Sequence, residues 1–151
     1  MVSALCVACG LCCEGSLFLY LRLSEAEAAQ MAARGAQVFR RKRLTAMRLG
    51  CPMLEGARCT MYETRPSGCR AYYCELALEV RDGRVGLDEA LQRVREARAL
   101  IVPVEAGLPP PVEGERENPL QRARQCGLLC GPDPLRRADA FLAEHFTGIS
   151  G

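Results

Sequence analysis

Four closely spaced cysteines lie near the start of the chain, in the run Cys6-Val7-Ala8-Cys9-Gly10-Leu11-Cys12-Cys13. Two residues between cysteines place two sulfurs within reach of one ion, and the intervening turn can direct backbone N–H groups at the thiolates. Because the spacing occurs twice, Cys6, Cys9 and Cys12 can supply three ligands from one loop. A similar run holds iron–sulfur clusters in bacterial ferredoxins. The pattern therefore predicts a site for zinc or for iron, including a [4Fe-4S] cluster.

Cys13 directly follows Cys12, and this adjacency is the unusual feature of the motif. In an extended segment, the two side chains would point to opposite faces. One sulfur could then serve one metal and the other a second, or one thiolate could bridge two ions. The chain has enough sulfurs for two four-sulfur sites, because its first eight cysteines are Cys6, Cys9, Cys12, Cys13, Cys51, Cys59, Cys69 and Cys74.

The choice between metal ligands and disulfides depends on the redox compartment. Ten cysteines in 151 residues would suggest a disulfide framework in a small secreted protein. Residues 1–20 lack the basic start, long apolar run and cleavage site of a signal peptide. The longest apolar stretch, Leu17 to Leu21, is too short to cross a bilayer. We therefore expect a cytoplasmic protein without membrane contact, whose reduced cysteines bind metal.

Charged and aromatic side chains near the later cysteines could complete such sites. Arginines can offset the negative charge of thiolates through N–H···S contacts, although a plain solvated surface is an equal alternative for them. Three tyrosines in the same region are expected to shield the metal-bearing loops from water. The arginines are Arg58, Arg65 and Arg70, and the tyrosines are Tyr62, Tyr72 and Tyr73.

Periodicity and capping signals predict a mixture of short strands and helices. Leucines alternate from Leu17 to Leu23, which is typical of a half-buried strand with these leucines on one face. Ser24 and Glu27 form a capping-box signature that opens a helix from Glu25 to Arg34, ended by Gly35. Further along we expect an extended segment over Val38–Leu49, a short strand over Cys59–Tyr62, and a helical turn from about Pro66.

The second half of the chain is predicted to be mainly helical. Asp82-Gly83 indicates a tight turn, which could join two short strands within Glu79–Val85. Asp88 opens a helix with an apolar face, Pro103 to Pro119 resembles a linker, and helices begin at Asn118-Pro119 and Asp133-Pro134. The fold class is α+β: a small cysteine-rich single domain with metal-bearing loops and short strands, followed by C-terminal helices. Residues 1–102 would form the cysteine-cluster metal-binding part, and residues 103–151 a Pro-rich linker with helices packing on it.

Three segments together resemble a known family. They are the Cys6–Cys13 motif, Cys51-Pro52-Met53-Leu54, and Cys59-Thr60-Met61-Tyr62-Glu63-Thr64-Arg65-Pro66-Ser67-Gly68-Cys69-Arg70. The combination resembles the CxxCxxCC (YkgJ-like) cysteine-cluster family of zinc- or iron-chelating domains. The resemblance implies seven metal-ligand positions, and Cys74 is added to them because it follows closely. The seven are Cys6, Cys9, Cys12, Cys13, Cys51, Cys59 and Cys69.

The same family includes a flagellin lysine N-methylase. The chain has neither a Gly-rich nucleotide loop after a strand nor the C-x3-C-x2-C run of radical chemistry on S-adenosylmethionine. The methylase is also a larger protein, so its activity is not transferred.

Other residues that could do chemistry give weaker signals. The basic run Arg40–Arg43 could contact nucleic acid, but the net charge of +2 and the lack of an interleaved aromatic platform favour a solvated face. Cys126 and Cys130 would share a helix face, as a metal contact, a redox pair or buried side chains. His145, the only histidine, is expected to pack or face solvent.

Three functions remain open at this point. The leading one is a cysteine-ligated metal-binding protein, holding zinc or an iron–sulfur cluster in a structural or metal-handling role. The second is an iron–sulfur enzyme or electron carrier, including a methylase-like activity, and the third is a thiol-redox sensor. Metal ions are the expected partners, a protein partner is compatible with the sequence, and nucleic acid is disfavoured. Acid–base catalysis finds no support, since the nearby carboxylates Glu14, Glu55, Glu63 and Glu75 could all be surface residues.

Overall fold

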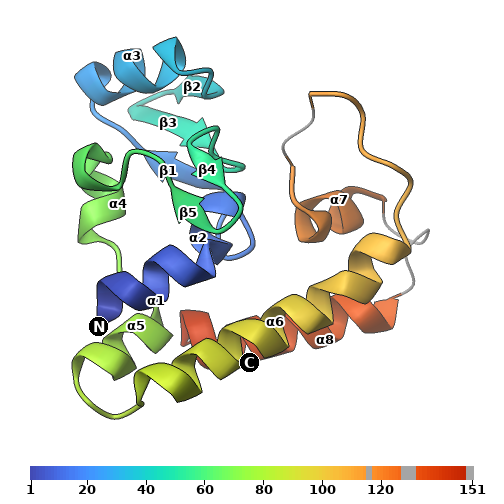
Figure 1. The fold of residues 1–151 in the computed structure, drawn as a ribbon. Helices are drawn as coiled ribbons and strands as arrows, with labels where there is room; N and C mark the ends of the chain where they lie inside the picture. Colours follow the sequence, from blue (N-terminus) through green and yellow to red (C-terminus); the bar gives the residue numbers. More distant parts are fainter. Residues whose placement is uncertain (115–116, 127–131, 149–151) are drawn as a thin grey trace.

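A three-stranded antiparallel sheet and a helix on one of its faces form the first half of the fold. The computed structural model describes residues 1–114, 117–126 and 132–148. The strands are β1 (Tyr20–Arg22), β2 (Val38–Arg41) and β3 (Leu44–Arg48), in the order β1-β3-β2. Helix α3 (Glu25–Ala33) lies along the sheet (Figure 1). Leu21, Met47 and Val38 are register partners on the face toward α3, and they belong to one apolar cluster with Met31.

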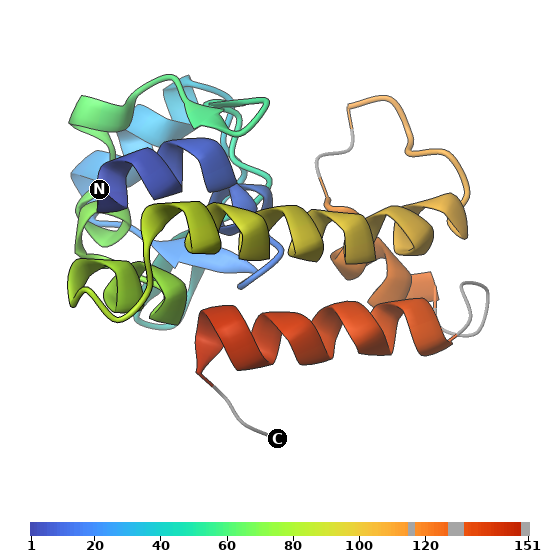
Figure 2. The same cartoon turned by 60° about the horizontal axis from the view of Figure 1, so that its bottom comes forward.

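Helices form the second half. These are α1 (Val2–Cys9), α5 (Glu75–Arg81), the long α6 (Leu87–Ala106), α7 (Pro119–Cys126) and α8 (Pro132–Leu142), which a π-helical turn (Ala143–Thr147) extends. Figure 2 shows α8 running beside α6. Leu5, Leu76, Leu120 and Phe146 are almost fully buried in the core that these helices share.

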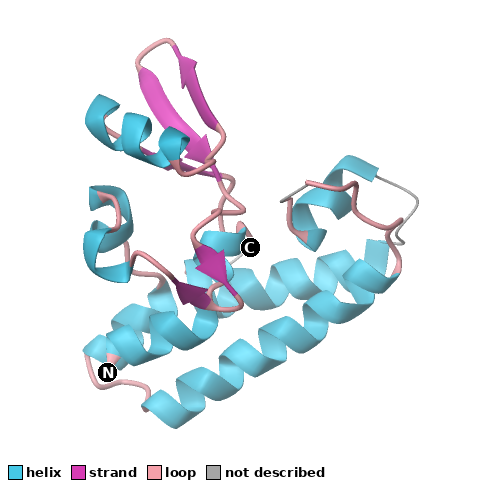
Figure 3. Ribbon diagram, turned by 45° about the horizontal axis from the view of Figure 1, so that its top comes forward, coloured by secondary structure: helices cyan, strands magenta, loops and turns pink. Residues whose placement is uncertain are grey.

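Short elements connect the two halves. They are α2 (Leu11–Glu14), the two-residue strands β4 (Leu54–Glu55) and β5 (Arg58–Cys59), a 3-10 turn (Tyr62–Thr64) and α4 (Ser67–Ala71). Figure 3 shows β4 and β5 as a small separate ribbon between the larger sheet and the helices. The chain is therefore a mixed α+β domain with two apolar cores, and its cysteine-bearing segments lie where the cores approach each other.

Several sequence predictions are confirmed. Both hydrogen bonds of the capping box are present, because Ser24 Oγ accepts from Glu27 N–H and Glu27 accepts from Ser24 N–H. Gly35 follows α3 with φ +91. The extended segment is the β2–β3 hairpin, a helix begins directly after Pro66, and Asn118 caps α7. The predicted apolar face of α6 is buried at Val94, Ala97 and Ile101.

Other predictions are wrong, each for a local reason. Glu79–Val85 does not contain two strands, since α5 runs to Arg81 and Gly83, at φ +73, turns the chain after it. The predicted linker begins later than Pro103, because α6 continues through this proline to Ala106. Only one helical turn follows Pro103, and the buried side chain of Val104 anchors that turn. Strand β1 is only three residues long, and Leu19 is 57% exposed instead of sharing the buried face.

Candidate metal centre

The Cys6–Cys13 motif lies on two consecutive helices instead of a loop. Helix α1 ends at Cys9, Gly10 takes φ +68, and α2 begins at Leu11. A Cβ on Gly10 would lie 3.0 Å from Ala57 Cα and 3.1 Å from Ala57 O, in the turn between β4 and β5. Cys12 and Cys13 do not take the extended arrangement considered from the sequence, because both residues are helical. Neighbouring residues on a helix still diverge by about 100° around its axis, so the two sulfurs can serve different neighbours.

All eight cysteines singled out from the sequence line one cavity of about 160 Å³. The cavity lies between the helical core and the sheet core, since its walls include Leu5 and Leu76 from the first and Leu21 and Met47 from the second. No disulfide links the nine cysteines of the described residues. Folding therefore brings together positions that are up to 68 residues apart; these are Cys6, Cys9, Cys12, Cys13, Cys51, Cys59, Cys69 and Cys74.

Four of these sulfurs form a neighbourhood on the helical side of the cavity, the helix-side cysteines Cys6, Cys9, Cys12 and Cys74. Burial raises the pKa of Cys12 well above its ordinary value, and Cys74 and Cys9 make the two largest electrostatic contributions that raise it further. Burial also raises the pKa of Cys9 to about 12, with Cys74 and Cys6 adding to the increase. Cys9 and Cys74 pack on the helical core.

The other four sulfurs form a second neighbourhood, beside the hairpin of β4 and β5. We call them the hairpin-side cysteines; they are Cys13, Cys51, Cys59 and Cys69. Burial raises the pKa of Cys13 to about 12, and Cys51, Cys69 and Cys59 raise it further. Burial likewise raises the pKa of Cys69 to about 11, with contributions from Cys51 and Cys59. A hydrogen bond of 2.8 Å from Cys51 N–H to Cys13 O fixes the backbone of one beside the other. Cys51, Cys59 and Cys69 pack on the sheet core.

Cys13 is the link between the two neighbourhoods. Among the described thiols with shifted pKa values, two electrostatic influences cross from one group to the other. Cys13 raises the pKa of Cys12, and Cys9 raises the pKa of Cys13. The remaining influences between these thiols stay within a group. The vicinal pair Cys12-Cys13 thus stands at the boundary between two sets of four sulfurs.

The sulfurs are close enough to influence one another, but they are not arranged as a finished site. Within residues 1–114, 117–126 and 132–148, no three or more His, Cys, Asp or Glu side chains are gathered as they would be around one metal ion. The raised pKa values of Cys9, Cys13 and Cys69 mean that these thiols carry protons at neutral pH. A metal must displace those protons and draw the sulfurs together.

The chemistry of the donors fits a soft thiophilic metal. Eight thiols line the cavity, and every carboxylate predicted near the cysteines (Glu14, Glu55, Glu63 and Glu75) is absent from its lining. Sulfur-only donor sets are typical of zinc, iron and iron–sulfur centres, whereas magnesium and calcium require oxygen ligands.

Two arginines place positive charge near the cysteines, one in the cavity lining and one behind Cys9. Arg65 lines it, lies 3.8 Å from the centre of the Tyr62 ring, and lowers the pKa of Cys6 and Cys69 against the larger effect of burial. The buried Nε of Arg65 has no hydrogen-bond partner. Arg98 donates to the carbonyl of Cys9 and is 3.2 Å from Glu14. Arg65 was predicted, but Arg58 and Arg70 do not line the cavity.

Backbone N–H groups also favour thiolates in the helix-side neighbourhood. The sulfur of Cys74, at the N-terminus of α5, accepts from the N–H groups of Leu76 and Ala77, which lower its pKa against the larger effect of burial. The sulfur of Cys9 accepts from Leu11 N–H. These contacts follow from helix geometry, because the first N–H groups of a helix have no partner within it.

Helix α7 holds the end of the cysteine motif. Asn118 Nδ2 donates to Glu14 O at 3.0 Å, and Gln121 Nε2 donates to Gly15 O at 3.1 Å. Both side chains are buried. A Cβ on Gly15 would lie 2.6 Å from Gln121 Nε2. Asn118, Gln121 and Arg98 were missed from the sequence, because nothing local to them signals a contact with residues about a hundred positions earlier.

The three predicted tyrosines lie at the cavity. Tyr62, Tyr72 and Tyr73 all line it, and Tyr72 packs edge-on against Phe18 with ring centres 4.8 Å apart. Burial raises the pKa of Tyr72, with Cys12 and Cys74 raising it further. Tyr72 and Tyr73 remain partly exposed, which fits a rim between the thiols and solvent.

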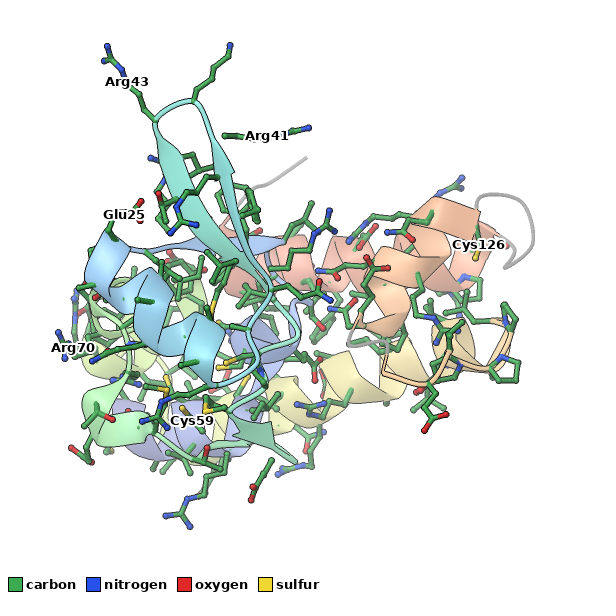
Figure 4. The ribbon with its side chains drawn as sticks, turned by 90° about the horizontal axis from the view of Figure 1, so that it is seen from above. Glu25, Arg41, Arg43, Cys59, Arg70 and Cys126 are labelled. Carbon is green, nitrogen blue, oxygen red and sulfur yellow. The ribbon has the colours of Figure 1, made fainter. Side chains whose placement is uncertain are left out.

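The other candidate residues lie elsewhere. Cys126 is on α7 and does not line the cavity; Figure 4 shows it far from Cys59. Cys130 lies outside the described residues. His145 packs against Phe141, with ring centres 4.4 Å apart, and is also absent from the cavity lining.

None of the helices among the described residues has the length and apolarity needed to cross a membrane. Comparison with known proteins gives one match. The model of the CxxCxxCC family, described as "Putative zinc- or iron-chelating domain", matches residues 5–92, more than half of the chain. No curated protein and no solved structure matches. The family description supports cysteine-ligated metal binding and gives no support to an iron–sulfur enzyme or electron carrier.

Proposed function

Because the chain belongs to the CxxCxxCC family, we propose that it binds two metal ions, one at the helix-side cysteines and one at the hairpin-side cysteines. The observation that carries this proposal is the division of eight cavity-lining sulfurs into two neighbourhoods at the adjacent residues Cys12 and Cys13. The proposed ligands of one ion are Cys6, Cys9, Cys12 and Cys74, and those of the other are Cys13, Cys51, Cys59 and Cys69.

Four thiolates around one ion suit zinc or iron in tetrahedral coordination. Such a site has no open position for water, so it stabilises a fold or stores an ion and does not activate a nucleophile. This is why we propose a structural or metal-handling role. A reducing compartment such as the cytoplasm would keep the cysteines available as ligands.

We further propose that the metal-binding part of the chain is residues 1–102 and that residues 103–151 support it. Supporting this division, Asn118 and Gln121 hold the carbonyls that end the cysteine motif, and α8 packs along α6. The described residues of the second segment contribute Phe146 to the cavity lining, but no cysteine.

Metal analysis of protein purified without oxygen tests the proposal, with visible absorption recorded on the same sample. We expect about two zinc or iron ions per chain. Cys9→Ser and Cys69→Ser should each retain one ion, because each removes a ligand from a different group. Cys126→Ser is the matched control and should retain both, since Cys126 lies away from the cavity.

Three results would overturn the proposal. A folded wild-type protein without metal excludes both sites, and a single ion that either variant removes indicates one shared site. Iron with equimolar acid-labile sulfide and a brown colour would mean that the cysteines hold an iron–sulfur cluster instead of two separate ions.

A further inference from the structure

The β1–β3–β2 sheet has a second face, opposite α3, which the family match does not explain. Strand register assigns its side chains: Tyr20 pairs with Arg48, Arg22 and Phe39 both pair with Ala46, and Arg41 pairs with Leu44. The residues between these along each strand have side chains that point to the other face, toward α3. Arg40 and Thr45 are examples, because both donate hydrogen bonds to the Glu25 carboxylate on α3. We call this second face the outer sheet face; it carries Tyr20, Arg22, Phe39, Arg41, Leu44, Ala46 and Arg48.

Two aromatic rings meet on the outer sheet face. Tyr20 and Phe39 come from strands on either side of β3, and their rings pack edge-to-face with centres 5.9 Å apart. Ala46, on β3 between them, is completely buried although it lies on this face. The rings therefore cover the middle of the face, and Tyr20 remains 42% exposed. Nothing in the linear sequence indicates this platform, because its two rings are 19 residues apart.

Uncompensated positive charge surrounds the rings. Arg22 and Arg41 lie on the outer sheet face, and Lys42 and Arg43 form the turn of the β2–β3 hairpin. All four are exposed, and no carboxylate of the described residues pairs with them. Arg40 differs, because Glu25 binds it at 2.8 Å on the other face. Figure 4 shows Arg41 and Arg43 at the far end of the hairpin, with Arg41 directed away from Glu25.

Arg48 completes the row of charges at the opposite end of the face. Its guanidinium is 60% exposed and lies 3.5 Å from the Glu117 carboxylate, which precedes α7. This pair is exposed on the arginine side, so it contributes little and can open when a stronger anion approaches. The outer sheet face thus has cations at both ends and aromatic rings between them.

We propose that the outer sheet face binds single-stranded nucleic acid. Bases can stack on Tyr20 and Phe39. The phosphates can then contact Arg22, Arg41 and the cations in the turn of the β2–β3 hairpin. Three strands span about 10 Å, which suits two or three nucleotides in contact with the face. An acidic peptide would satisfy the cations but leave the exposed ring without a stacking partner. A duplex keeps its bases stacked inside, so it could use only the cations.

Fluorescence anisotropy with a labelled mixed-sequence 12-nucleotide DNA and the matching RNA tests the proposal on the full chain as purified. We expect micromolar binding at low salt that weakens as salt rises, and at least fivefold weaker binding to the matching duplex. Arg41→Glu should weaken single-strand binding at least fivefold and reduce the salt slope by about one. Tyr20→Ala should weaken it about fivefold with an unchanged salt slope.

Arg137→Glu is the matched control, because Arg137 is exposed on α8 and the change alters net charge equally. It should change the affinity less than twofold. The proposal fails if neither nucleic acid binds, if Arg137→Glu weakens binding as much as Arg41→Glu, or if Tyr20→Ala has no effect. It also fails if the duplex or polyglutamate binds as tightly as the single strand. Metal content enters none of these comparisons, so the two proposals can fail separately.

Discussion

The two cysteine groups differ in the frame that holds them. The helix-side cysteines lie on α1, α2 and the start of α5, against the larger apolar core. Backbone N–H groups act to lower the pKa of Cys9 and Cys74, and Arg98 also acts to lower that of Cys9. The hairpin-side cysteines lie around β4 and β5, which are two residues long each, against the smaller core. Apolar burial is the main stabilising contribution to folding, so the helix-side frame can form without metal. If the hairpin-side cysteines bind the proposed ion, we expect their frame to depend on it, as small metal domains do.

Metal removal should therefore have very unequal effects, and this is the largest difference we expect. After chelation, amide hydrogen exchange should rise by about a hundredfold or more across residues 51–71, because a segment with little apolar burial loses its cross-link. Exchange in α6 and α8 should stay nearly unchanged. Mass spectrometry of deuterated peptides measures both, and equal loss of protection in the two regions would remove the distinction between the frames.

Gly10 joins the two regions and should be intolerant of a side chain. Its Cβ would approach the Ala57 backbone to 3.0 Å, and backbone cannot yield cheaply. Gly10→Ala should lower the free energy of unfolding by about 2–4 kcal/mol, combining left-handed strain with a clash.

Gly56→Ala is the control, because Gly56 has a similar φ of +61 and nothing within 4 Å. It should show the strain alone, about 1 kcal/mol. Urea denaturation compares the two variants, and equal losses would mean that the contact between Gly10 and Ala57 contributes nothing.

Asn118 should matter to the helix-side region through its amide nitrogen, which donates to Glu14 O and, at 3.4 Å, to Ser16 Oγ. Asn118→Asp retains an oxygen to cap Gln121 N–H but loses the donor to Glu14 O. We expect a loss of about 1–2 kcal/mol in unfolding free energy, because Glu14 O loses a partner and gains a nearby negative charge. Thermal unfolding measures it. If Asn118→Asp matches wild type while Asn118→Ala does not, Asn118 acts as a cap alone.

Glu27 should make the folding stability of the hairpin-side region weakly dependent on pH. Hydrogen bonds from the N–H groups of Ser24 and Ser67 lower its pKa from 4.5 to about 2, and so tie α4 to α3. A lowered folded-state pKa stabilises the fold above pH 4.5, and this contribution is lost as the pH falls toward 2. Glu27 is partly exposed to solvent, which screens the interaction, so we expect this contribution to the unfolding free energy to be below about 1 kcal/mol.

Glu27→Gln should remove that part of the acid dependence. Stability curves between pH 5 and pH 3 for the variant and wild type test this, and parallel curves would contradict the role assigned to Glu27.

Local signals were the predictable part of this fold. The capping box at Ser24, the turn after Pro66 and the apolar face of α6 depend on neighbours in sequence, and all three were predicted correctly. Spacing points to the Cys6–Cys13 motif, the family resemblance adds Cys51, Cys59 and Cys69, and proximity adds Cys74. The structure brings all eight cysteines to one cavity. Their assignment as ligands stays a prediction.

What could not be predicted depends on long-range packing. Gly10, between the helices that carry Cys9 and Cys12, lies so close to Ala57 that a Cβ would be 3.0 Å from Ala57 Cα, and no local rule contains this contact. Asn118 and Gln121 reach Glu14 and Gly15 only because α7 folds back on the motif. Tyr20 and Phe39 meet only once β1 and β2 flank β3.

Cys12→Ser and Cys13→Ser, studied side by side, test the central claim most directly. Native mass spectrometry gives the number of ions per chain, and hydrogen exchange shows which region each change affects. The proposed two sites predict that each variant retains one ion, that Cys13→Ser increases exchange over residues 51–71, and that Cys12→Ser increases it at the start of α5. Loss of the same ions and the same protection in both variants would contradict two separate sites.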